Sequence, residues 1–364
     1  MSEIPTEIME QIIDELSDDR EALVASLSVS RAFHSRARYH LFQTVRLETE
    51  SDFNQFNSLC DISPVISSLV QSLKIFSRST VPQLPSLPNV TSLHIRGHLD
   101  DVWQTNFLST TVLMFEDIVF STAMSFRTWI CAYSHLTSLS LISVIIHHPA
   151  VVGAYALAQG PPLEFLSIAY VNYSVYKAFL GSTSKAISRF ALHGLRKIQH
   201  KTVFAYDAAG IHKILAVTCS TIQELDMRVH VFDPRPLFNE VLDISQVPTV
   251  NYRVSGVSKI PFTNNIRWLS YCTDENDRPA SMERLVIHLD LPGFLDRLTF
   301  TECLEPLDAI LTDPRYCMLK VVQFILGGKE RRLEHGLQAY RDDISMALPK
   351  LHAAGRLVVE DEAA

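Results

Sequence analysis

A six-residue pattern, apolar-x-x-apolar-x-apolar, recurs through most of the chain. Clear copies read VQSLKI, VTSLHI, LTSLSL, LEFLSI, ISRFAL, IQELDM, MERLVI and LKVVQF, and weaker copies, TVLMF and TVNYRV, lie between them. Apolar residues that alternate over so short a stretch predict a strand with one buried face. The copies recur every 20 to 37 residues, and self-similarity at such a period is typical of stacked strand-and-return units.

The middle apolar residue of each copy sets the register of the predicted strands. These residues are Leu73, Leu93, Leu113, Leu139, Leu166, Phe190, Leu225, Tyr252, Leu285 and Val322. We expect the last two apolar residues of each strand to point inward and the residue between them to point outward. The stretches DDVWQTNFL, STAMSFRTWICAYS and AAGIHKILAVTC carry helical signals. Since no unit can bury its inner face alone, stacking would supply the core.

The pattern predicts an α/β fold, in which a curved sheet of parallel strands carries helices and loops outside. The first six spacings are close to leucine-rich-repeat length. The Asn or Cys that closes the turn in regular repeats of that kind has no fixed position here, and the spacings lengthen in the second half. We therefore expect an irregular solenoid with insertions. A doubly wound α/β enzyme shares the alternation of strands and helices and remains an alternative.

The first residues follow a different period. Ile4, Ile8, Ile12 and Leu16 lie four apart, which predicts a helix with one apolar face. Pro5 is expected at the first helical position, where its missing N–H costs nothing. An apolar stripe at the head of the chain, before any domain has been built, suggests a surface made for another protein.

Two more short helices are expected in this unit. Asp18, with Glu21 three residues later, can cap a helix from residue 20 to about 28, and a third helix is expected from about 30 to 42. Residues 1–21 carry eight acids against one base, whereas residues 22–47 carry four arginines and no acid. These charges are expected either to offset one another on solvated faces or to form the polar rim of an interface.

The stretches IPTEIMEQIIDEL and LVASLSVSRAFHSRARYHLF resemble an F-box, the adaptor-binding module of cullin-based ubiquitin ligases. Ile4-Pro5-Thr6-Glu7 fills the Leu-Pro-x-Glu element, Ile12 and Leu16 follow, and residues 29–33 fill the last element. Ser30 stands where Cys is common and Phe33 where Trp is common. Combined with the repeats, the chain resembles F-box proteins with irregular leucine-rich repeats of the kind common in fungi.

The resemblance implies a division of the chain into four parts. Residues 1–47 would be the F-box, 48–69 a helical linker with a helix capped at Ser51 or Asp52, 70–359 the repeats, and 360–364 an acidic tail. It also implies which residues would contact a Skp-family adaptor, and through it a cullin. That adaptor-binding set is Ile4, Pro5, Glu7, Ile8, Ile12, Leu16, Val29 and Phe33.

Composition narrows the classes of partner. A formal charge of −8 argues against a nucleic-acid-binding surface. Six scattered cysteines without a C-x-x-C pair indicate reduced thiols rather than a disulfide or zinc framework. The most apolar region, 144–171, is interrupted by His147-His148-Pro149 and by Gly160-Pro161-Pro162, so no membrane span is expected. With no secretory signal, we expect an intracellular protein, in the cytoplasm, the nucleus or both.

Motifs for catalysis are weak throughout. GSTS at residue 181 lacks the second glycine of a nucleophile elbow, and LGGKE at residue 326 lacks the first glycine and the Ser/Thr of a P-loop. His147-His148 is expected in a loop before Pro149, and no metal site or cofactor is expected. Acid runs such as DDRE are expected to be helix caps or solvated faces.

Together these features predict a non-enzymatic protein, the substrate-recognition subunit of a cullin-type (SCF) ubiquitin ligase. The F-box would dock the adaptor and the repeats would bind a target protein, whose identity and binding surface the sequence does not indicate. Two alternatives stay open: a non-degradative interaction scaffold and an α/β enzyme.

Overall fold

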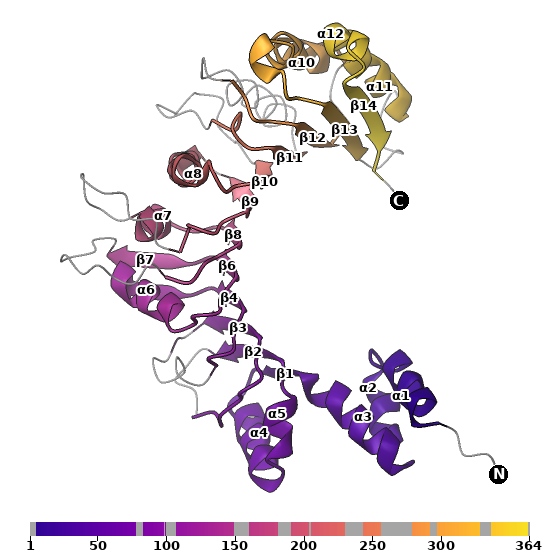
Figure 1. Cartoon of the computed structure of the whole chain (residues 1–364), viewed down its shortest axis with the longest axis vertical. Coiled ribbons are helices and arrows are strands. Elements are labelled where there is room, and N and C mark those ends of the chain that lie inside the picture. The colour runs from indigo at the N-terminus through magenta and orange to yellow at the C-terminus, as the bar shows by residue number, and fades with distance from the viewer. Residues whose placement is uncertain are drawn as a thin grey trace.

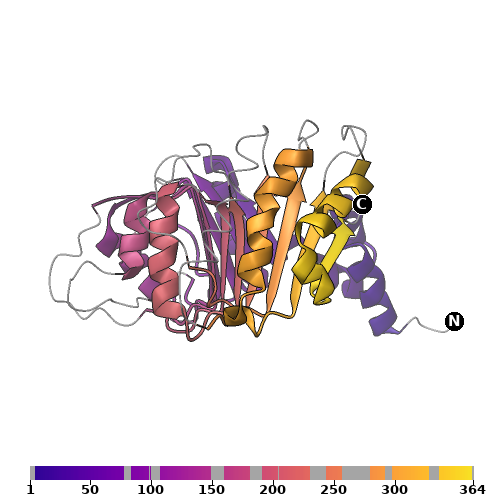
Figure 2. The ribbon, with the colours of Figure 1, turned by 90° about the horizontal axis from the view of Figure 1, so that it is seen from above.

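The computed structural model of the chain describes residues 5–77, 83–97, 99, 107–148, 160–180, 191–203, 205–229, 243–255, 279–291, 297–327 and 336–362. The fold is α/β, with a long parallel sheet whose strands line the inner side of a curved array (Figure 1). Helices cover the outer side of this sheet, as the view from above shows (Figure 2). The N-terminal helices and the last strand lie at opposite ends of the array.

Twelve strands form the main sheet, and their order in space is their order along the chain. That order is β1-β2-β3-β4-β6-β8-β9-β10-β11-β12-β13-β14, with every described pair parallel. The bounds are β1 Thr44–Leu47, β2 Ser72–Ser77, β3 Ser92–Gly97, β4 Val112–Glu116, β6 Ser138–Ile142, β8 Phe165–Ala169, β9 Lys197–Val203, β10 Glu224–Val229, β11 Thr249–Ser255, β12 Arg284–Asp290, β13 Val321–Gly327 and β14 Leu357–Asp361. Such an uncrossed order is that of a solenoid-like array.

Helices occupy the returns between many of these strands. Their bounds are α1 Thr6–Glu15, α2 Arg20–Ser26, α3 Arg31–Gln43, α4 Glu50–Ile62, α5 Val65–Leu69, α6 Ala123–Cys131, α7 Tyr173–Leu180, α8 Ala205–Thr218, α10 Arg297–Leu311, α11 Gly336–Ala347 and α12 Pro349–Ala353, with a 3-10 turn at Pro314–Tyr316. The helical signals expected before residues 136 and 222 correspond to α6 and α8. The signal expected at DDVWQTNFL lies largely outside the described residues.

The register residues of the first five predicted strands face one another across the sheet. Leu73, Leu93, Leu113, Leu139 and Leu166 are successive partners, and all are buried. The apolar residue two positions later in each strand is buried as well. The residue between these two points to the opposite face of the sheet, which is the inner side of the array. One face of the sheet is therefore a continuous apolar core, as stacked repeats require.

Two predicted register residues were wrong. Phe190 lies outside the described residues, and the strand between β8 and β10 is β9, where Ile198 pairs with Leu166 and Leu225. The apolar pattern is weak in β9 because a polar side chain, His200, takes an inward position.

In β11, Val250 rather than Tyr252 continues the row, pairing with Leu225 and Leu285. Both Val250 and Tyr252 are buried there, so alternation alone could not choose between them.

The turns after β3, β4, β6 and β8 use a backbone conformation in place of a fixed Asn or Cys. Gly97, Asp117, Ser143 and Tyr170 each lie at the end of a strand or just after it, and all have positive φ, from 53° to 96°. The amide of Asp117 donates to the carbonyl of Ile142, and that of Ser143 to Ala169, both at 2.9 Å. Left-handed residues thus close these four units whatever their side chain, and at Asp117 and Ser143 a backbone hydrogen bond supports the turn.

Three local assignments also differ from expectation. His147-His148 belongs to strand β7 (Ile145–His148), which pairs with β5 (Val119–Thr122) in a separate two-stranded sheet, rather than to a loop. Helix α4 is capped by Thr49, in a capping box with Asp52, rather than by Ser51 or Asp52. The last strand extends to Asp361, into the stretch expected to be an acidic tail.

The C-terminal end of the array is closed by the polar contacts of two buried aspartates. Asp308 of α10 is buried and accepts hydrogen bonds from the backbone of Lys350 and Leu351, which caps the first turn of α12. Arg297 of α10 donates to both oxygens of Asp343 on α11, at 2.7 and 2.6 Å. These contacts fix three helices over the last strands.

Helices α7 and α8 meet at Gly210. A Cβ built there would lie 2.3 to 2.7 Å from ring atoms of Tyr176. The ring cannot easily move away, because the Tyr176 hydroxyl donates to Asp207 at 2.9 Å and lies 2.7 Å from His200 Nε2. All three of these polar residues are buried, so the glycine permits a close contact between α7, α8 and β9.

Gly210→Ala is expected to lower the free energy of unfolding by roughly 1–3 kcal/mol, the usual cost of overpacking a core. Without this contact, Ala in a helix would stabilise the protein by about 1 kcal/mol relative to Gly. The sign of the change in the free energy of unfolding therefore tests the contact. Urea unfolding would measure it. In a Tyr176→Ala background the same substitution should become stabilising, and a destabilisation that persists there would contradict the explanation.

Candidate partner-binding face of the N-terminal helices

Helices α1, α2 and α3 form a unit with a small core of its own. Ile13, Leu23, Ala37 and Leu41 are buried within it. Leu16, Leu27, Phe33 and Phe42 pack on this cluster while partly exposed. So few buried side chains supply little hydrophobic stabilisation, which is typical of units that depend on a neighbour.

Helix α1 presents apolar residues on two faces, only one of which the unit covers. Ile13 is 1% exposed and forms part of the core, whereas Ile8 and Ile12 are each 46% exposed. Leu16 turns toward the core and is half-buried. The predicted four-residue stripe is therefore divided: its C-terminal member packs inside, and Ile8 and Ile12 face outward.

The first residues of the unit are exposed as well. Pro5 precedes the helix at the N-cap rather than occupying its first position, because its ψ of 143° is extended. Its carbonyl accepts hydrogen bonds from Ile8 and Met9 and so starts the helix. Glu7 lies exposed in the first turn, where a carboxylate is favoured by the helix dipole. Ile4 lies outside the described residues.

The segment between α2 and α3 holds the last predicted site residues. Val29 is 64% exposed, next to the start of α3. Phe33 packs partly on the small core, so only part of its ring is free for another contact. Ser30, which stands where the F-box pattern commonly has Cys, caps α3 by accepting a hydrogen bond from the amide of Phe33.

Large apolar residues are exposed on α1, on α2 and in the segment between α2 and α3. We name Ile8, Ile12, Val24 and Val29 the outer set; each is at least 46% exposed. Val24 on α2 was not among the predicted site residues. Val24 lies three residues before the partly buried Leu27, so its place in the sequence did not distinguish it from a residue that packs on the core.

Asp14 connects the acidic and basic halves of the unit. Its carboxylate accepts from Arg36 Nε at 2.5 Å and Nη2 at 2.8 Å, and lies 2.7 Å from His40 Nε2. These hydrogen bonds, first that of Arg36 and then that of His40, lower the pKa of Asp14 from 3.8 to about 2. One of the eight acids thus fastens α1 to α3.

Asp19, rather than Asp18, caps α2 through the amide of Ala22.

The unit is joined to the sheet through α3. Phe42 packs on both the small core and the main core, and the chain passes from α3 directly into β1. Arg38 donates to Ser63 at 2.9 Å, and Gln71 donates to the Tyr39 hydroxyl at 3.2 Å. These contacts hold the outer set in a fixed direction relative to the array.

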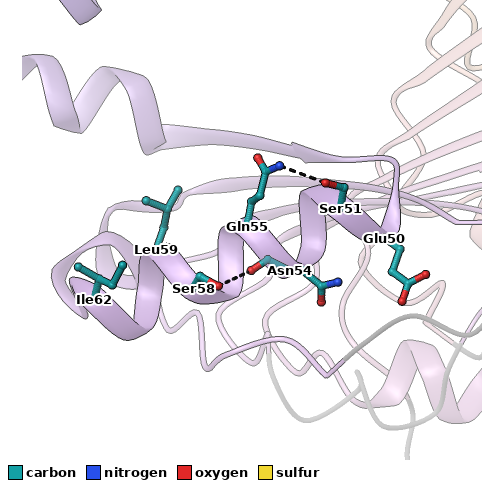
Figure 3. A pocket seen from close by; sticks show the side chains of 7 residues that line it. All are labelled: Glu50, Ser51, Asn54, Gln55, Ser58, Leu59 and Ile62. Carbon is teal, nitrogen blue, oxygen red and sulfur yellow. Dashed lines mark hydrogen bonds between the residues drawn. The ribbon is translucent and has the colours of Figure 1, made fainter.

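Helix α4 carries a shallow groove of 690 Å³ beside this unit (Figure 3). All seven lining residues come from α4 itself, and Leu59 and Ile62 at its C-terminal end are exposed. The drawn polar groups bond within the helix: Gln55 donates to Ser51 and Ser58 to the carbonyl of Asn54. Because its lining residues all lie along one helix, this groove does not bring polar groups from different elements to one point.

Within the described residues, no group of three or more metal-binding side chains gathers at one place. In that same part of the chain, no helix combines the length and apolar character needed to cross a membrane. Neither a protein-family model nor a curated protein matches the chain.

The low pKa of Asp14 gives a prediction for the stability of α1. Because its folded pKa lies below the ordinary value, its pairing stabilises the unit above about pH 3.8 and is lost as the pH falls through about 2. Hydrogen exchange of α1 amides should therefore show less protection in Asp14→Asn than in the wild type at pH 6. The difference should vanish near pH 2.

Glu7→Gln, which removes an exposed carboxylate from the same helix, is the control for charge alone. It should lower the protection of α1 at pH 6 far less than Asp14→Asn does, because only the helix dipole favours the Glu7 carboxylate. Equal protection of the wild type and Asp14→Asn at pH 6 would contradict a stabilising role for this ion pair.

Proposed function

We propose that the protein is the substrate-recognition subunit of a cullin-type (SCF) ubiquitin ligase. Residues 1–47 act as an F-box that docks a Skp-family adaptor, and through it a cullin. The irregular leucine-rich repeats hold a target protein. The chain itself performs no bond chemistry.

The exposure of Ile8 and Ile12 is the observation that carries this proposal. Both belong to the stretch that resembles the F-box pattern, and each is about half exposed beside a fully buried Ile13. Apolar residues gathered on one surface are typical of protein interfaces. A specific interface buries roughly 800 Å² on each partner, more than one helix face supplies, so Val24 and Val29 are expected to contribute.

The proposed mechanism is proximity. The outer set belongs to the N-terminal helical unit, which lies at one end of a continuous array, and the inner face of the sheet extends away from it (Figure 1). A target held on that face and a ubiquitin-carrying enzyme recruited through the adaptor would share one assembly. Their effective concentration rises without any catalytic group on this chain.

Ile12→Asp is expected to weaken binding of a purified Skp-family adaptor by at least about tenfold, because a charge replaces an apolar anchor at the centre of the contact. Ile8→Asp should act in the same direction. Isothermal titration calorimetry on the full chain would measure both dissociation constants.

Met346→Asp is the matched control, since Met346 on α11 is exposed to a similar degree but lies at the other end of the array. It should bind the adaptor as the wild type does. Thermal unfolding would establish that each variant is folded. Adaptor binding that survives both Ile8→Asp and Ile12→Asp would remove this face from the interface, and absence of binding by folded wild type would refute the proposed function.

A further inference from the structure

The inner face of the sheet holds a polar pocket of 440 Å³ over four adjacent strands, β9 to β12. It lies near the middle of the second half of the sheet, far along the array from the N-terminal helices (Figure 1). The lining residues are Gln199, His200, Lys201, Asp226, Arg228, Asn251, Arg253 and His288. Apart from His200, all of these side chains point away from the apolar core of the array and toward the inner face of the sheet.

A row of basic side chains crosses this pocket. Arg228 of β10 is the direct partner of Arg253 of β11, which is the direct partner of His288 of β12. Lys201 of β9 lines the same pocket. Neighbouring strands lie about 4.8 Å apart, and like charges opposite one another destabilise a sheet. The direct pairing of Arg228 with Arg253 is therefore unfavourable by itself, and an anion held between the two guanidinium groups would stabilise it.

The carboxylates around the row leave its donors available. Arg228 lies 3.7 Å from Asp290, and Arg253 lies 3.8 Å from Glu362. Both distances are too long for a hydrogen bond, so the two acids attract the guanidinium groups without accepting a hydrogen bond at these contacts.

Two buried atoms in the row have unused hydrogen-bonding capacity. Among the described residues, Arg228 Nε and His288 Nδ1 are buried without a hydrogen-bond partner. Polar atoms left in this way are costly, and most buried polar groups are paired. Burial, and then the charge of Arg253, lowers the pKa of His288, so its ring is neutral near pH 7 and can donate one N–H.

We infer that this pocket binds a carboxylate, carried by an acidic side chain of a protein segment that crosses the inner face. Arg228 and Arg253 would donate to its two oxygens, with His288 beside them. The planar fork of a guanidinium matches the geometry of a carboxylate. The inference rests on the proposed function only in identifying the segment as part of a target protein.

The surrounding charges favour a single negative charge over a double one. The lining has three cations, Lys201, Arg228 and Arg253, against one carboxylate, Asp226. With Asp290 and Glu362, which lie near the arginines, three carboxylates face three cations. These three acids would repel the two negative charges of a phosphoryl dianion more strongly than the single negative charge of a carboxylate.

Fluorescence anisotropy with the full chain, in the absence of adaptor, would test the inference. Four labelled octapeptides serve as probes: one with three central glutamates and blocked ends, its glutamine counterpart, the glutamine peptide with a free C-terminal carboxylate, and one with a central phosphoserine. The glutamate peptide should bind at least about tenfold more tightly than the blocked glutamine peptide, since charge-assisted hydrogen bonds are lost in the latter.

Each of the other outcomes would overturn the inference or part of it. Equal binding of the glutamate and blocked glutamine peptides would show that no carboxylate is recognised. Tighter binding of the phosphoserine peptide would replace the carboxylate by a phosphoryl group. Tighter binding of the peptide with the free C-terminus would replace the side chain by a chain end.

A pair of variants locates the site. Arg253→Gln should weaken binding of the glutamate peptide by about tenfold. Arg284→Gln should not, because Arg284 lies on β12 outside the pocket and donates to Gln323 at 2.6 Å. Equal effects of the two variants would place binding elsewhere. Ile12→Asp should bind the peptide as the wild type does, so loss of adaptor docking and failure of this inference are distinguishable.

Discussion

The structure depends on one constraint: an apolar strand face that no single repeat can bury. The row that runs from Leu73 through Leu166 and Ile198 to Leu357 keeps its register across the eleven neighbouring strands from β2 to β14. A slip of one residue would turn a strand's apolar side chains to the inner face. Register is therefore strongly specified, while the returns between strands vary in length and in content.

This constraint explains why the returns tolerate such different local solutions. The early strands end in left-handed turns at residues as unlike as Gly97, Asp117, Ser143 and Tyr170. A positive φ costs a non-glycine residue of order 1–3 kcal/mol. At Asp117 and Ser143 the surrounding sheet maintains the conformation through a hydrogen bond from the turn amide to the next strand. Stacking, rather than turn chemistry, determines the repeat.

The same reasoning identifies which features a single sequence could predict. Leucines at the inward positions of β2 to β8 gave the strands and their register, because burial leaves a direct mark on the residue types. The strand β9 was misplaced because His200 occupies an inward position, and its suitability depends on Tyr176 and Asp207 from two helices. Such a partnership has no local pattern. The cap of α4 at Thr49 was missed by two or three residues because Thr49, Ser51 and Asp52 are all good capping residues.

For the N-terminal unit, the sequence indicated apolar periodicity but could not say which residues the unit would bury itself. Ile12 and Ile13 are neighbours of identical type, and only the packing of α1 on α3 separates an exposed side chain from a buried one. Val24 was missed because its exposure depends on the angle at which α2 packs.

The inner face poses the converse problem. Arg228, Arg253 and His288 lie 25 and 35 residues apart in the chain, and nothing in their local sequence relates them. They become neighbours because the core residues on the opposite side of the same strands hold the register. The polar row is thus a consequence of the apolar row: the burial that aligns Leu225, Val250 and Leu285 also brings three basic side chains to one place. A binding surface in this fold is specified jointly by its outward residues and by the core that aligns them.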